Sequence, residues 1–166
     1  MNQVVIVHMD NFCLPVANRR KKYAEVSDLD WKRLKDQVII PLQNGKSARF
    51  QLYDWPEDCL KDWMSIDVGG LLIIDGVTAT RRELSSYYNI RIWFSCPQDT
   101  RISRLLGRGD TSAEEISHWI SSEERYIASH NSEKRAHLVI DSSADNKIKE
   151  GIGWFTKSWS PPIHAS

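Results

Sequence analysis

The chain has 166 residues, of which 41% are hydrophobic and 27% charged, which is enough for one domain with a buried core. Its 22 basic and 22 acidic side chains cancel, which argues against a nucleic acid or an anionic membrane surface as partner. No apolar run reaches the ~18 residues of a membrane span. Three cysteines without a C-x-x-C pair, and no signal peptide before them, predict a reducing, cytoplasmic location.

Four apolar runs predict buried strands of a parallel sheet. They are rich in Val, Ile and Leu, do not alternate strictly, and lie far enough apart for a helix between them. The runs cover residues 4–8, 71–75, 90–95 and 137–141. The sequence therefore predicts an α/β fold in which a parallel sheet is flanked by helices.

A first helix is predicted between the first two strands, beginning near Ser27 or Asp28 and ending at Asn44-Gly45. Its apolar positions recur at helical spacing: Trp31, Leu34, Val38 and Leu42. Further helices are predicted over about 80–88, 97–106 and 112–130. After Asp141 the composition changes to Ser, Asn, Lys, Gly and Pro. We therefore expect one domain over residues 1–141 and a peripheral or poorly ordered tail over 142–166.

Two aspartates at the ends of predicted strands are candidate catalytic or metal-binding groups. Asp10 follows the first strand, and Asp75 ends the second, directly before Gly76. In an open α/β sheet, ligands bind at the carboxyl ends of the strands. A carboxylate there can accept a hydroxyl proton or bind Mg²⁺. The alternative is structural, because aspartate is also common in turns and caps after strands.

Two further groups offer surfaces for a phosphorylated or aromatic ligand. Arg101, Arg104 and Arg108 are spaced i, i+3 and i+7, so one helix face carries three guanidinium groups. Such a face suits phosphate, which Arg binds through paired hydrogen bonds, although without further context the pattern favours a solvated helix face. Tyr53-Asp54-Trp55 offers aromatic surface and a carboxylate for a base or sugar, or forms a simple turn.

The order of these segments resembles the uridine kinase branch of the P-loop nucleoside kinases. That family has a D-D/S-F element followed by Pro, a Y-D-W element, a strand ending E-G-V, a Y-Y-D-x-R-I-W strand, an E-D-R-Y-x-x-x-H segment and an A-D-L-V-I-D strand. The corresponding segments here are Asp10-Asn11-Phe12 with Pro15, Tyr53-Asp54-Trp55, Asp75-Gly76-Val77, Tyr87 to Trp93, Glu124-Arg125-Tyr126 with His130, and Ala136 to Asp141.

The resemblance implies phosphoryl transfer from ATP, with Mg²⁺, to the 5′-hydroxyl of a small nucleoside such as uridine. Asp10 would be the general base and, with Asp75, would order Mg²⁺. Four residues would bind the nucleoside: Phe12, Tyr53, Trp55 and Arg125. Three would form a catalytic lid over the transferring phosphoryl group, the last two also contacting ATP: Arg101, Arg104 and Arg108. A lone helix histidine is usually structural, and we expect this of His130.

The chain also departs from the family pattern. The family's first strand and its G-x-x-x-x-G-K-S/T phosphate loop would precede Val4, where only three residues stand. Gly45-Lys46-Ser47 does not replace the loop, because Ile40 occupies the first glycine position and a helix precedes it. We therefore expect a P-loop kinase-like sheet without its first, central strand. Such a chain would bind ATP weakly. Its unpaired strand edges would favour association between copies.

Asn11 and Asp75 also replace residues that are acidic and glutamate, respectively, in the family. Three interpretations stay open at this point. The chain is a nucleoside kinase, a non-catalytic pseudokinase or nucleoside-binding module, or an incomplete gene product whose true start lies upstream. Which nucleoside is preferred, and the oligomeric state, depend on pocket and surface shape, which spacing does not fix.

Overall fold

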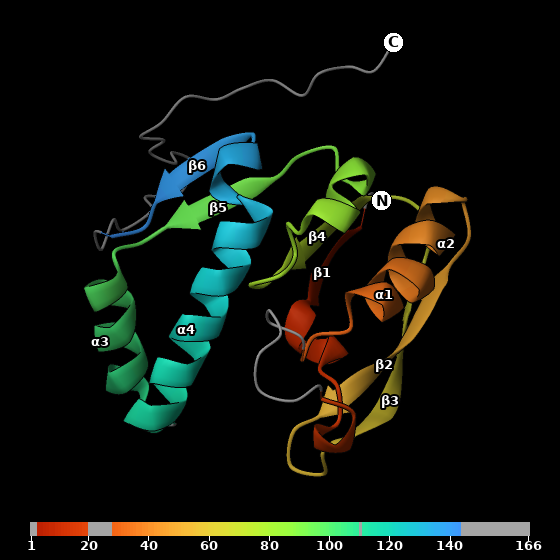
Figure 1. The fold of residues 1–166 in the computed structure, drawn as a ribbon. Helices are drawn as coiled ribbons and strands as arrows, with labels where there is room; N and C mark the ends of the chain where they lie inside the picture. Colours follow the sequence, from red (N-terminus) through yellow and green to blue (C-terminus); the bar gives the residue numbers. More distant parts are fainter. Residues whose placement is uncertain (1–2, 20–27, 110, 144–166) are drawn as a thin grey trace. The chain divides into compact units, whose positions relative to one another are not determined.

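The computed structural model describes residues 3–19, 28–109 and 111–143 (Figure 1). It divides the chain into two compact units, Met1–Ala79 and Thr80–Ser166, called unit 1 and unit 2 below. The predicted tail lies outside the described residues beyond Ser143. In the part of the chain that is described, no helix combines the length and the apolarity needed to cross a bilayer.

The first two predicted strands of unit 1 are confirmed with their bounds. β1 (Val4–His8) and β4 (Leu71–Asp75) pair in parallel, so that His8 lies opposite Asp75 at the carboxyl end of both strands. One face of this pair is turned to the core, with Val7 fully buried. The other face is exposed along its length, as the 61% exposure of Val4 illustrates.

Unit 1 also contains an antiparallel hairpin that the sequence did not predict. It consists of β2 (Ala48–Asp54) and β3 (Cys59–Ile66), whose pairing is interrupted by an irregularity between Gln51 and Tyr53. Most of β3 is exposed, and polar residues interrupt its apolar ones, so it lacks the continuous apolar run of a buried strand.

The predicted helix between β1 and β4 is present as one continuous segment. It consists of α1 (Trp31–Leu34), a π-helical stretch (Lys35–Ile39) and α2 (Ile40–Gln43). The predicted start was wrong, because Asp30 is the cap and its carboxylate accepts a hydrogen bond from the Arg33 N–H at 3.0 Å. The end is as predicted, with Gly45 at φ +67°.

The core of unit 1 joins this helical segment, the hairpin and the 3₁₀ turn Met9–Phe12 that follows β1. Phe12 stacks on Phe50 of β2, with 5.1 Å between the ring centroids. The buried apolar residues of these elements are Val7, Met9, Phe12, Cys13, Leu34, Val38, Ile39, Ala48, Phe50, Tyr53 and Ile66. The turn that carries Asp10 is therefore anchored in the core.

Unit 2 contains a second parallel pair, β5 (Ile92–Ser95) and β6 (Leu138–Asp141), in which Ile92 lies opposite Leu138. Both predicted strands are present but begin slightly later than predicted. Directly before β5, the backbone N–H of Arg91 donates to the His137 side chain at 3.1 Å, while its carbonyl accepts from the backbone N–H groups of His137 and Leu138.

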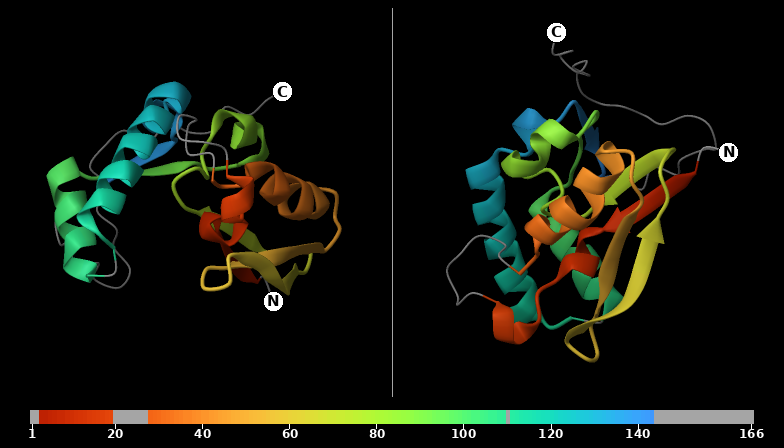
Figure 2. Two further views of the ribbon diagram at one scale, coloured as in Figure 1. Left: turned by 60° about the horizontal axis from the view of Figure 1, so that its bottom comes forward. Right: turned by 90° about the vertical axis from the view of Figure 1, so that its right-hand side faces the viewer.

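Two helices run side by side in unit 2, α3 (Gln98–Arg108) and α4 (Ala113–His130) (Figure 2). Ser112 and Glu115 form a reciprocal capping box at the start of α4, which explains why its predicted bounds were nearly correct. Pro97 is the cap of α3 and not its first helical residue. The helix predicted over 80–88 is a 3₁₀ segment, Arg82–Tyr87.

Among the described residues each strand has a single partner strand, giving the pairs β1–β4, β2–β3 and β5–β6. The predicted α/β class with parallel strands is thus confirmed, while the parallel strands belong to small sheets of two. The absence of a first, central strand stays a prediction.

Candidate functional site

The carboxyl end of the β1–β4 pair carries the two aspartates that the sequence singled out. Asp10 lies in the turn directly after β1, and its side chain is exposed. Asp75 is the last residue of β4, with a side chain 67% exposed. The parallel pairing brings both to the same end of one strand pair, where ligands bind in open α/β sheets.

His8 is a third polar residue at this edge, and sequence reasoning missed it. Its Nδ1 lies 3.2 Å from Oδ2 of Asp75. The register of the two strands would have identified His8. In a parallel pair whose strands end at His8 and Asp75, these two residues lie opposite one another. Register is a non-local property that one strand's own sequence does not specify.

Glycine is required at position 76, directly after Asp75. Its φ is +131°, and a Cβ there would lie 2.7 Å from the Cβ of Met9. Any other residue would force the turn after β4 away from the turn after β1. Gly76 therefore keeps the two chain segments that carry Asp75 and Asp10 in close contact.

Phe12 and Arg33 support the Asp10 turn from inside. Phe12 has no exposed surface and lies between Phe50 and the Arg33 guanidinium, which is 4.5 Å from its ring centroid. Arg33 also donates to the backbone carbonyl of Asn11 at 2.8 Å and to that of Gln51 at 2.7 Å. The sequence assigned Phe12 to the nucleoside by resemblance, whereas in the structure it braces the turn.

The Tyr53-Asp54-Trp55 element combines a buried tyrosine with an exposed tryptophan. The Tyr53 hydroxyl donates to Asp58 at 2.5 Å and accepts from Arg19 at 3.0 Å. The hydrogen bond to Asp58 raises the pKa of Tyr53 and lowers the pKa of Asp58. Trp55 packs edge-on against Tyr53 and is 56% exposed, so Trp55 is the ring with surface for a ligand.

The arginines of the predicted lid lie in unit 2 on α3, a helix that buries no residue. Arg101 forms an ion pair with Glu123 of α4. Arg104 donates to the Ser142 carbonyl at 3.0 Å and lines a shallow hollow with Thr100 and Ser103. Arg108 at the end of α3 is exposed, as is Arg125 on α4, which the sequence assigned to the nucleoside.

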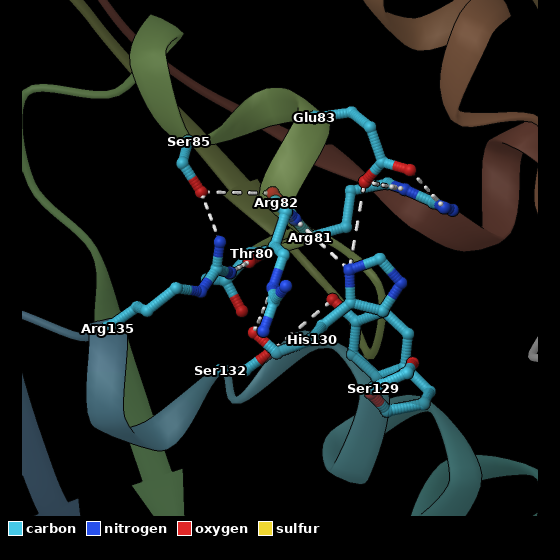
Figure 3. A network of polar contacts seen from close by, with 10 residues as sticks. Thr80, Arg81, Arg82, Glu83, Ser85, Ser129, His130, Ser132 and Arg135 are labelled. Carbon is cyan, nitrogen blue, oxygen red and sulfur yellow. Dashed lines mark hydrogen bonds and ion pairs between the residues drawn. The ribbon is translucent and has the colours of Figure 1, made fainter.

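His130 is a buried structural residue, as expected, within a polar network of unit 2 (Figure 3). Its Nδ1 accepts a hydrogen bond from the Arg82 N–H at 3.2 Å. Arg81 donates two hydrogen bonds of 3.0 Å to Glu83, which lowers the pKa of that carboxyl to about 2. Arg135 donates to the Thr80 carbonyl and, at 2.7 Å, to the Ser85 hydroxyl.

The donor set at the β1–β4 edge fits a magnesium ion whose remaining ligands are waters or substrate phosphates. Within the described ranges, no three His, Cys, Asp or Glu side chains gather closely enough to hold a metal. Magnesium needs no such cluster, since it is commonly held by one or two carboxylates, waters and substrate phosphates. Asp10 and Asp75 supply two exposed carboxylates of this kind.

Comparison with known proteins gives a fold match without a sequence match. No protein-family model matches the chain, and no curated protein matches it. Among solved structures, it is similar to a protein described as a possible uridine kinase from Bacillus stearothermophilus, with 19% identity and a TM-score of 0.62. The match covers 82% of this chain and 71% of that one. At this identity the similarity establishes the fold alone, and the chain has an α/β fold similar to that of this protein.

Proposed function

We propose that this chain is a nucleoside kinase-like protein that transfers the γ-phosphate of ATP to the 5′-hydroxyl of uridine or a similar nucleoside in the cytoplasm. The observation that carries the proposal is the exposed Asp10 at the carboxyl end of β1, next to the strand that ends in Asp75, within a kinase-like fold. A carboxylate in this place is suited to accept a hydroxyl proton.

In this mechanism Asp10 is the catalytic base. Its carboxylate takes the proton from the nucleoside hydroxyl while that oxygen bonds to the γ-phosphorus and the bond from phosphorus to the bridging oxygen breaks, leaving ADP. The backbone of the Asp10 turn is held by Arg33, which donates to the Asn11 carbonyl. Because the turn is already fixed, its carboxylate loses less conformational entropy when it is positioned for proton transfer.

The other proposed roles come from the family resemblance, and the side chains that would touch a ligand are exposed. Asp75 and Asp10 would hold magnesium, which supplies charge neutralisation at the phosphates. Trp55 would stack on the base, with Tyr53 fixed behind it. Arg104, Arg108 and Arg125 would contact phosphate or nucleoside oxygens.

A nucleoside-binding module without transfer is the second candidate, and one observation favours it. Arg101 is already paired with Glu123, and Arg104 donates to a backbone carbonyl. Phosphoryl transfer depends on positioned positive charge, so arginines engaged within unit 2 stabilise a transferring phosphoryl group less. Such a protein binds uridine and turns over no ATP.

The test uses the full chain with uridine, ATP and Mg²⁺, and follows UMP and ADP by chromatography. Asp10→Asn should lower turnover ~100-fold or more, because a positioned base typically contributes that much. Asp62→Asn, a change at an exposed aspartate of β3, is the matched control. Retention of more than about a tenth of the turnover by Asp10→Asn would contradict the base role.

Titration calorimetry separates the two candidate functions. Uridine binding without product formation would favour the binding module. We expect ATP to bind weakly to this chain, and a dissociation constant in the low micromolar range would contradict that expectation. Light scattering after size-exclusion chromatography would test the proposed association between copies through strand edges.

A further inference from the structure

His8 and Asp75 form a pair, but the mechanism proposed above gives a role only to Asp75. The two residues face one another at the last position of the β1–β4 ladder, and 3.2 Å separates Nδ1 of His8 from Oδ2 of Asp75. Both side chains are open to solvent, with exposures of 55% and 67%. They lie at the edge of the sheet that carries Asp10.

The backbone sets the geometry of this pair. The ladder from Val4 to His8 is in continuous register with Leu71 to Asp75. Directly after the pair, Gly76 touches Met9 so closely that a Cβ would not fit. His8 and Asp75 are thus held together by constraints on either side of them, independently of their mutual attraction.

Stability does not account for the pair. An exposed ion pair or hydrogen bond of this kind contributes only about 0–1 kcal/mol. The strands are anchored on their other face, where Val7 is fully buried and Leu72 and Ile74 are half-buried. A hydrogen bond with little structural value at a ligand-binding edge needs a different explanation.

We propose that His8 is a positioning residue for Asp75. The Nδ1–H of its ring donates to Oδ2 of Asp75 and fixes the direction in which the carboxylate faces a cation at the edge of the sheet. The inference rests on the proposed function, in which Asp75 helps to hold magnesium. Hydrogen bonds to metal-binding carboxylates act in this way, and their loss typically costs 10–100-fold in metal affinity or activity.

Two substitutions separate this role from a general effect of removing histidine. His8→Asn retains an N–H donor close to the position of Nδ1, whereas His8→Gln carries its amide farther out, near the position of Nε2. With Mn²⁺ alone as the probe, paramagnetic broadening of the full chain's NMR signals gives the dissociation constant. We expect His8→Gln to raise it about 10-fold, and His8→Asn to restore affinity to near the wild-type value.

A second readout is independent of metal. At about pH 9, where an ordinary imidazole is neutral, nitrogen NMR of the His8 ring should find the proton on Nδ1 in the metal-free chain. Asp75→Ala should abolish this signature, because the acceptor is gone. A wild-type ring protonated only on Nε2 would overturn the proposal.

The outcomes distinguish this inference from the proposed function. If Asp75→Ala weakens Mn²⁺ binding while His8→Gln does not, the positioning role is overturned and the metal role of Asp75 stands. If Asp75→Ala leaves Mn²⁺ binding unchanged, Asp75 is not a metal ligand, and both the metal role and the positioning role fall. Circular dichroism of each variant verifies that the fold is retained.

Discussion

The exposed carboxylates at the strand ends of unit 1 and the arginine network of unit 2 use charged side chains in opposite ways. In unit 1 an apolar core of helix, hairpin and turn carries the fold, and the carboxylates of Asp10 and Asp75 stand exposed at strand ends. In unit 2 arginines hold the backbone together. Arg91, for example, donates to the carbonyls of Ser85 and Arg135, each at 3.0 Å.

This difference separates residues that are available for function from residues that maintain structure. A guanidinium that donates to buried carbonyls leaves unsatisfied acceptors when it is removed. An exposed carboxylate leaves nothing unsatisfied, because water replaces its contacts. Substitutions of the unit 2 arginines that donate to backbone carbonyls should therefore lower stability, whereas substitutions of Asp10 and Asp75 should change ligand binding alone.

The largest expected effect is in the core of unit 1. Phe12→Ala should lower the free energy of unfolding by about 3–5 kcal/mol, because a buried ring is replaced by a cavity. Guanidinium denaturation followed by tryptophan fluorescence measures it. Trp55→Ala is the matched aromatic control, and its exposed ring should make its effect clearly smaller. Equal losses in the two variants would mean that Phe12 is not the anchor of the turn.

The next effect should appear in the arginine network of unit 2. Arg135→Met keeps much of the side-chain volume but removes the donors to the Thr80 carbonyl and the Ser85 hydroxyl. We expect a loss of about 1–3 kcal/mol, measured by the same denaturation. Arg125→Met, on the exposed side of α4, should stay within about 0.5 kcal/mol of the wild type. If Arg135→Met leaves the free energy of unfolding unchanged, the contrast between the two units is contradicted.

Acid should weaken unit 2 through Glu83. Its pKa in the folded chain is about 2, below the usual 4.5, because Arg81 donates two hydrogen bonds to it. The stabilisation is therefore fully present above about pH 4.5 and is lost as the pH falls towards 2. The side chain is 41% exposed, so screening should limit the effect to about 1 kcal/mol. Glu83→Gln should remove this part of the pH dependence, and an unchanged acid profile in that variant would exclude Glu83 as its source.

Local sequence signals predicted the elements whose own residues carry a clear pattern. β1 and β4 are short apolar runs, and α4 begins with a capping box, so their bounds could be read from neighbouring residues. The β2–β3 hairpin was missed because β3 is largely exposed and mixes polar with apolar residues. Its strand character comes from pairing with β2, which is a tertiary property.

The candidate site could be predicted only in part, for the same reason. The ends of strands identified Asp10 and Asp75, since the position of a residue after an apolar run is a local feature. His8 depends on strand register, and the bracing of the Asp10 turn by Arg33 depends on a contact across unit 1. Phe12 shows the opposite kind of error. It was assigned to the ligand because it lies close to the candidate base in the family motif, but in the structure it is a core residue.

The smallest expected effect is also the sharpest test of the comparison. Asp10→Asn and Asp75→Asn should each leave the free energy of unfolding within about 0.5 kcal/mol of the wild type, because both side chains are exposed. The hydrogen bond that the Asp10 residue accepts from the Cys13 N–H uses its backbone carbonyl, which the substitution keeps. Arg101→Met, which removes the ion pair with Glu123 on α4, is the contrasting variant from unit 2. If the aspartate variants lose more stability than Arg101→Met, the carboxylates are structural, and their assignment to catalysis and metal binding loses its physical basis.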